Sequence, residues 1–219
     1  MSGKKIGGAG LRGQSAGETS ICTVGVSGSG LTYRGFDIVD LAENTTFEEV
    51  AYLLLKGKLP NSQELKAYIE KLKTLRGLQP ELRSTLEGIP KTAHPMDVLR
   101  TGCSVLGNLE QEEGFINQTD HADRMLSAFP SILSYWYQYS HYGKRIDTET
   151  SDDTIGGHFL HLLHGKKPSQ LHDQVMSISL ILYAEHEFNA STFAARVCAS
   201  TLSDIHSAVT SAIGTLRGP

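Results

Sequence analysis

The sequence predicts an all-α fold that carries one small β-hairpin near its N-terminus. From residue 45 onward, apolar side chains recur at helical spacing, and Gly or Pro separates one apolar stretch from the next. Only one stretch, near residue 20, has the short β-branched pattern of a strand. Strands do not alternate with helices, which argues against an α/β fold. We therefore expect eight or nine helices and one hairpin.

The composition excludes several classes of protein. The net charge of −4 gives no overall basic field for nucleic acid. The longest apolar run, residues 178–184, is interrupted by Ser179 and is far shorter than the ~20 residues of a membrane span. Cys22, Cys103 and Cys198 lack metal-ligand spacing, which favours a reducing, cytoplasmic compartment over a disulfide framework or a zinc site. We expect no nucleic acid, membrane or metal partner.

The N-terminal region contains the strand signal. Residues 1–14 are rich in Gly and Lys, and we expect them to be mobile. Residues 19–24 and 31–34 are the predicted strands of the hairpin, joined by a Gly/Ser loop over 25–30. That loop resembles a phosphate-binding loop in composition. It has no lysine, however, and a strand rather than a helix follows it, so a turn is favoured.

Four helices are predicted before a polar loop at residues 108–118. Each begins at a capping residue or at a proline of the first turn. A capping side chain accepts from a free N–H group of the first turn, and a proline has no N–H group that would need a partner there. Gly57 ends the first of them and Gly77 the second. Their first residues or caps are Thr45 or Thr46, Ser62, Pro80 and Pro95.

Five more helices are predicted after that loop. A long one over residues 119–141 contains Pro130, which we expect to kink it because proline removes a backbone hydrogen bond. In the others, apolar residues recur at spacings of three and four. They begin at Ile155, at Leu171, at a cap of Ser191 or Thr192, and at a cap of Asp204.

Residues 183–192 form the segment most suggestive of a binding site. A strongly apolar helix ends there in polar residues, and a new helix is predicted to begin directly afterwards. Free N–H groups at a helix start attract carboxylates. A histidine beside them, such as His186, can hydrogen-bond to a carbonyl or carboxylate oxygen. A structural helix–helix corner explains the same pattern, and both interpretations stay open on these residues alone.

Two further groups of polar residues invite a functional interpretation. The first is a run of basic side chains, of which Lys71 and Arg76 are candidate anion contacts, for instance to a cofactor phosphate, although a solvated face is the commoner explanation. The second is the histidine set His158, His161 and His164. At spacings of three residues, these side chains point in different directions around one helix and cannot all face one metal. We therefore interpret them as partly buried, hydrogen-bonded histidines.

Several motifs, in the right order, resemble the citrate synthase family. They are residues 31–35 (LTYRG), 46–60 (TFEEVAYLLLKGKLP), 93–98 (AHPMDV), 185–192 (EHEFNAST) and 216–219 (LRGP). The resemblance covers residues 15–219 and implies the N-terminal helical part of that family's large domain. Three other stretches look like its 2-methylcitrate synthase branch: residues 10–14 (GLRGQ), 19–24 (TSICTV) and 156–165 (GGHFLHLLHG).

The resemblance implies an enzyme that condenses an acyl-CoA with oxaloacetate and releases CoA, with no cofactor beyond the CoA thioester substrate. His186 matches an oxaloacetate-binding histidine of the family, and Asn189 lies in the same motif. Tyr183 lies one helical turn before His186, so we expect it either to shape the acyl pocket or to be a core residue. The family's catalytic residues are expected just after Pro219, so the chain alone is expected to be inactive.

The resemblance also leaves alternatives open. Propionyl-CoA is the expected acyl donor, acetyl-CoA is a second one, and an ordinary citrate synthase is the alternative enzyme. A non-catalytic helical binding module is the alternative from another class. The family also implies a homodimer, which the apolar stretches 132–142 and 177–184 support indirectly because they look too apolar for an exposed surface.

Overall fold

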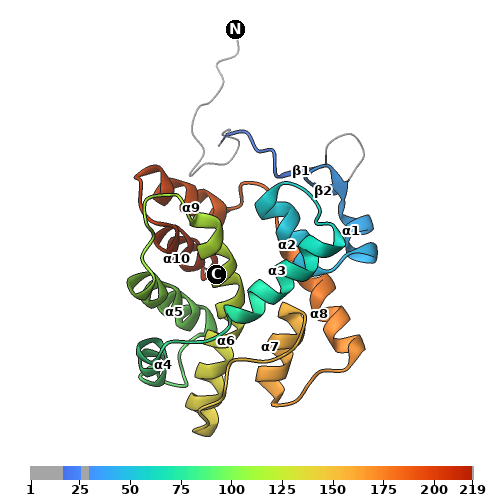
Figure 1. Cartoon of the computed structure of the whole chain (residues 1–219). Helices are drawn as coiled ribbons and strands as arrows, with labels where there is room; N and C mark the ends of the chain where they lie inside the picture. The colour runs from blue at the N-terminus through green and yellow to red at the C-terminus, as the bar shows by residue number, and fades with distance from the viewer. Residues whose placement is uncertain (1–16, 26–29, 219) are drawn as a thin grey trace.

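The computed structural model describes residues 17–25 and 30–218 (Figure 1). These residues form ten helices and one antiparallel sheet with the strand order β1-β2-β3. The expected fold class, mostly helical with a small N-terminal sheet, is confirmed. Among the described residues, no helix is both long enough and apolar enough to cross a membrane. The segment expected to be mobile, residues 1–14, lies outside the described residues.

The predicted hairpin is present, but a third strand follows it. β1 (Cys22–Val24) pairs with β2 (Leu31–Tyr33), and β2 pairs with β3 (Phe36–Asp37). The turn between β2 and β3 has only two residues, Arg34 with φ 51° and Gly35 with φ 89°. Two positive φ angles are typical of the tightest hairpin turns, but arginine is not a residue type that signals one. The sequence analysis therefore missed this strand.

The first helix, α1 (Ile38–Asn44), was also missed. Asp37 caps it by accepting a hydrogen bond from the Val39 N–H at 2.8 Å. The nine predicted helices are all present. They are α2 (Phe47–Lys56), α3 (Ser62–Thr74), α4 (Pro80–Glu87), α5 (Pro95–Leu109), α6 (Gln118–Tyr142), α7 (Ile155–His164), α8 (Gln170–Tyr183), α9 (Ala190–Ser200) and α10 (Ile205–Leu216).

Local capping chemistry accounts for most helix ends. Thr46 and Glu49 form a capping box at the start of α2, in which each side chain accepts from the other residue's backbone N–H. Gly57 ends α2 in the left-handed conformation. α3 ends at Thr74, so the prediction that it extends to Gly77 was wrong.

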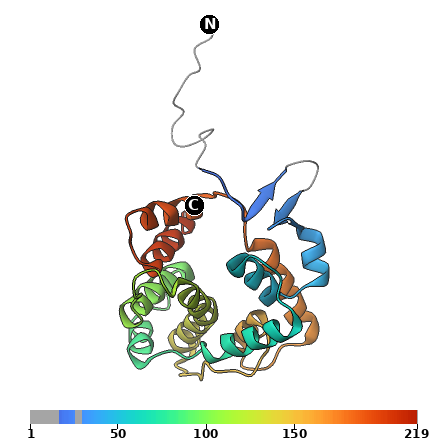
Figure 2. The same cartoon turned by 45° about the horizontal axis from the view of Figure 1, so that its top comes forward.

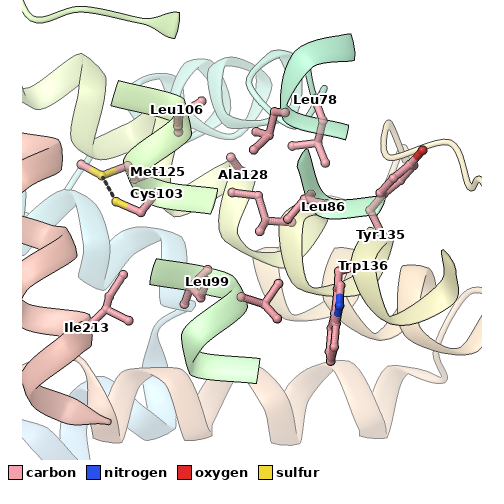
Figure 3. Close-up of a cluster of buried hydrophobic side chains, with 13 residues drawn as sticks. Leu78, Leu86, Leu99, Cys103, Leu106, Met125, Ala128, Tyr135, Trp136 and Ile213 are labelled. Atoms are coloured by element: carbon pink, nitrogen blue, oxygen red, sulfur yellow. Dashed lines mark hydrogen bonds between the residues drawn. The ribbon is translucent and has the colours of Figure 1, made fainter. Parts of the chain in front are cut away.

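Two hydrophobic cores lie on either side of α6. One is built from α4, α5, α6 and α10 (Figure 3), and the other from the sheet, α1, α2, α3, α7 and α8. Neighbouring residues of α6 serve different cores, because Met125 belongs to the first and Leu126 packs against the second. Pro130 lies buried within α6, and the kink expected there stays a prediction.

Buried polar groups join α6 to its neighbours. The fully buried Asp123 accepts from the Tyr68 hydroxyl at 2.8 Å and from Lys71 Nζ at 2.6 Å, both on α3. His158 of α7 is also fully buried, and its two ring nitrogens hydrogen-bond to Ser131 at 3.1 Å and Thr150 at 3.0 Å. Burial lowers the pKa of His158 to about 3, so its ring is neutral at physiological pH.

The other two histidines of α7 differ from His158. His161 is half-buried and hydrogen-bonds to the carboxylate of Asp152 at 2.6 Å, whereas His164 is exposed. The interpretation as hydrogen-bonded, partly buried side chains therefore holds for His158 and His161, but it was wrong for His164.

Glu48 of α2 generates a prediction about stability. Its side chain is buried, and one carboxylate oxygen accepts from the N–H of Ile155, the first residue of α7, at 2.7 Å. Burial raises the pKa of Glu48 from 4.5 to about 6. Folding therefore favours the protonated form, and this group lowers stability as the pH rises from about 4.5 through about 6. The shift corresponds to roughly 2 kcal/mol at neutral pH.

We expect Glu48→Gln, which keeps the acceptor and removes the charge, to raise the free energy of unfolding by about 1–2 kcal/mol near pH 7.5. The gain should disappear near pH 4.5. Urea denaturation at both pH values measures it, and Glu43→Gln, a change at an exposed glutamate of α1, is the control. An effect of equal size at both pH values would contradict the assigned protonation behaviour.

Candidate functional site

A groove of 910 Å³ lies between the end of α8 and the pair α9 and α10. Its lining is mostly apolar, and α10 contributes Ile205, Val209 and Leu216 to it. Polar side chains gather where the chain passes from α8 to α9. Figure 2 shows this connection crossing from one half of the molecule to the other. The groove therefore combines an apolar surface with a polar end.

His186 lies at the polar end of the groove. It is exposed and belongs to the six-residue connection between Tyr183, the last residue of α8, and Ala190, the first of α9. Its backbone N–H donates to the Glu185 carboxylate at 3.1 Å. The structure thus places His186 beside the N-terminus of α9, as the sequence predicts, where the helix dipole favours an anion.

Asn189 forms the N-terminal cap of α9. Its side-chain oxygen accepts from the Thr192 N–H at 2.9 Å. The prediction that Ser191 or Thr192 caps this helix was therefore wrong, and an asparagine two or three residues earlier does so instead. The Asn189 side chain also lines the groove, and its amide NH₂ group is the part that the cap does not use.

Tyr183 forms part of the groove wall. Its side chain is 90% exposed, so the alternative that it is a core residue was wrong for the described chain. Tyr183, His186 and Asn189 line one groove although only one of them belongs to a helix. The acyl-pocket and substrate-binding roles of the three residues stay predictions.

Lys71 and Arg76 lie elsewhere. Lys71 forms ion pairs with Asp120 and Asp123 at 2.6 Å each. Arg76 is buried and donates to the backbone carbonyl of Thr150 at 2.8 Å. Neither residue lines the groove. Both cations have partners within the chain, and their role as anion contacts stays a prediction.

Arg196 is a groove residue that the sequence analysis missed. It lies on α9, and its guanidinium carbon is 4.5 Å from the centre of the Phe188 ring. Stacking on an aromatic ring holds a guanidinium in place and leaves its edge free for oxygen ligands. The sequence does single out this residue, because Arg196 is the only Arg or Lys between residues 183 and 200.

Comparison with known proteins identifies the family. A sequence profile described as "Citrate synthase, C-terminal domain" matches residues 10–219. The chain belongs to the citrate synthase family. The resemblance of its motifs to that family is thereby confirmed, over a range that begins slightly earlier than residue 15.

Individual citrate synthase relatives agree with the profile. A 2-methylcitrate synthase of Shewanella oneidensis is 71% identical over 99% of this chain, which spans 58% of that relative's length. Among solved structures, citrate synthase from Thermotoga maritima has a TM-score of 0.83 and 37% identity, over 96% of this chain and 56% of its own. Citrate synthase from Thermoplasma acidophilum, solved in a ternary complex with carboxymethyl coenzyme A and oxaloacetate, has a TM-score of 0.88 and 27% identity over the same shares.

Proposed function

We propose that the protein acts as a 2-methylcitrate synthase, which condenses propionyl-CoA with oxaloacetate and releases CoA. The observation that carries this proposal is the 71% identity to the Shewanella oneidensis 2-methylcitrate synthase over 99% of the chain. The groove supports it, because an apolar surface with a histidine and a helix N-terminus at one end suits a small dicarboxylate beside an acyl chain.

In this proposal His186 binds oxaloacetate. Its ring donates a hydrogen bond to an oxygen atom of oxaloacetate, while the N-terminus of α9 favours the carboxylates. The carbon next to the propionyl thioester loses a proton to a base, the resulting enol attacks the ketone carbon of oxaloacetate, and the ketone oxygen gains a proton to become a hydroxyl group. Water then cleaves the thioester into a carboxylate and free CoA. Side chains and the CoA substrate supply this chemistry, so we expect no further cofactor.

An ordinary citrate synthase, with acetyl-CoA as substrate, is the second candidate. The similarity to the citrate synthases of known structure favours it. A non-catalytic module has no support among the relatives described above. The cytoplasmic location proposed from the cysteine content is compatible with either enzyme.

The test is the release of free CoA from each acyl-CoA in the presence of oxaloacetate, with the full-length protein as its gene encodes it. Turnover with propionyl-CoA that exceeds turnover with acetyl-CoA supports the first candidate, and the reverse order supports the second. We expect residues 1–219 alone to release none, because the enol-stabilising histidine and the base implied by the family are not among the residues matched here. An absence of turnover by the full-length protein with both acyl-CoA substrates would contradict the proposed function.

We also propose that the protein is a homodimer. The stretch 132–142, which we expected to be too apolar for a surface, packs largely inside the chain and does not support a dimer. Better support comes from α9, which buries no residue, and from Val197 and Leu202, whose side chains are 51% and 75% exposed. Light scattering should report twice the mass of one full-length chain, and the mass of a single chain would contradict the proposal.

His186→Ala should lower kcat/KM for oxaloacetate by roughly 100-fold, because it removes a hydrogen-bond donor to the charged substrate. The measurement is steady-state kinetics of the full-length protein with varied oxaloacetate. His172→Ala, which changes an exposed histidine in the first turn of α8, is the control. A normal kcat/KM in the His186 variant would remove this residue from the site.

Tyr183→Ala should change the preference between propionyl-CoA and acetyl-CoA and leave the KM for oxaloacetate largely unchanged. The two acyl groups differ by one methylene, which a pocket wall discriminates by about 10–200-fold. The ratio of the two kcat/KM values measures the effect, and Tyr142→Ala, which truncates an exposed tyrosine at the end of α6, is the control. An equal loss for both substrates would mean that Tyr183 does not determine selectivity.

A further inference from the structure

The buried hydroxyl of Tyr33, on β2, binds the backbone just before His186. It accepts from the Glu185 N–H at 3.2 Å and donates to the carbonyl of Ile181 at 2.9 Å, with the carbonyl of Glu185 also in reach at 3.2 Å. Tyr33 itself is fully buried in the second core. The hydroxyl is therefore a fixed point to which the end of α8 and the start of the His186 segment are both attached.

Cys22, on β1, binds the backbone just after His186. Its sulfur accepts from the Glu187 N–H at 3.0 Å, and its S–H group lies 3.5 Å from the Glu185 carboxylate. Burial raises the pKa of the Cys22 thiol to about 11, so the sulfur stays protonated at neutral pH. Cys22 and Tyr33 are directly paired across β1 and β2, so one pair of facing residues supplies both contacts.

The segment needs such support because its backbone is strained. Glu187 has a φ of 57°, in the left-handed region that side chains other than glycine rarely adopt. Such a conformation costs on the order of 1–3 kcal/mol and persists only where the surroundings impose it. The sulfur of Cys22 holds the N–H of this residue, and Tyr33 holds the peptide group two positions before it.

We propose that Tyr33 and Cys22 are positioning residues for His186, and this inference rests on the proposed function. The His186 ring is exposed, so the direction in which it points depends on the backbone that carries it. The hairpin fixes the peptide groups on both sides of that residue. Loss of either contact lets the ring move, and a histidine that moves binds oxaloacetate less well.

The experiment compares four variants of the full-length protein. Tyr33→Phe removes one hydroxyl and keeps the ring, and Cys22→Ala removes the sulfur. Cys22→Ser keeps an acceptor for the Glu187 N–H and serves as the conservative rescue. Thr23→Val is the matched control, because Thr23 hydrogen-bonds across the same hairpin to Thr32 on the exposed face.

The first readout is independent of the reaction. In substrate-free protein, amide hydrogen exchange at Glu185 should accelerate roughly tenfold in Tyr33→Phe, and exchange at Glu187 should accelerate similarly in Cys22→Ala, as expected for the loss of one hydrogen bond. The NMR signal of the His186 ring Cε1–H should shift in both variants. Cys22→Ser and Thr23→Val should resemble the parent protein in both measurements.

The second readout is kinetic. The KM for oxaloacetate should rise about tenfold in Tyr33→Phe and Cys22→Ala, with the KM for the acyl-CoA unchanged, and Cys22→Ser should restore it. A general loss of stability would instead affect both substrates and would appear in Thr23→Val as well.

Unchanged amide exchange, or an unchanged KM for oxaloacetate in an active enzyme, would overturn the proposal. If the parent protein releases no CoA, the proposed function fails. The exchange rates and the His186 ring signal then still decide whether the hairpin positions His186.

Discussion

The fold depends on a helix that must be buried on two sides at once. α6 contacts α3, α4, α5, α7 and α10, and it forms a wall shared by both hydrophobic cores. A polar side chain buried on such a helix is costly without a partner, because water does not reach it. Ser127 and Ser134 of α6 have no hydrogen-bond partner within the described residues, but others are paired. Gln138 illustrates the solution: its amide donates to the carbonyls of Leu162 and Leu163 and so anchors the C-terminal end of α7.

One of these polar groups, Asp123, is a buried carboxylate that joins α6 to Tyr68 and Lys71 of α3. A buried carboxylate without its cation is strongly destabilising, so Lys71 has to remain where it neutralises the charge. The basic side chains of α3 and of the turn after it show that a run of charged residues in a sequence does not reveal its function. Lys71 and Arg76 hold the interior together, and Lys73 pairs with Asp153 at 2.5 Å. The cation that lines the groove, Arg196, stands alone in its stretch of sequence.

Features that depend on contacts between residues close in the sequence could be predicted, whereas features that depend on distant contacts could not. Thr46, Pro95 and Asp204 mark helix starts through contacts within four residues, so they were predictable. α1 has only seven residues, and its one buried side chain, Leu41, belongs to the second core. Asp37 marks its start locally, but so short a helix is marginal on its own and depends on packing against the second core.

The candidate site likewise has one part that the sequence predicts and one part that it does not. The segment around His186 was recognisable, because an apolar helix followed by polar residues and a cap is a local pattern. The contacts that hold this segment were not, since Tyr33 and Cys22 lie 148 to 165 positions away from their partners. A tyrosine and a cysteine in a short strand look like ordinary core residues in a sequence. Function here rests on a loop whose geometry is set by a distant part of the fold.

That separation also has a consequence for biosynthesis. A ribosome that adds about 5–20 residues per second makes the hairpin about 7–33 s before it reaches the segment that packs on it. A short hairpin is barely stable alone, and its strand edges can pair with other chains until they are covered. The closure of so long a loop is entropically unfavourable and comes late in folding. We therefore expect the groove around His186 to take shape only once α8 has been made and packs against the hairpin in the second core.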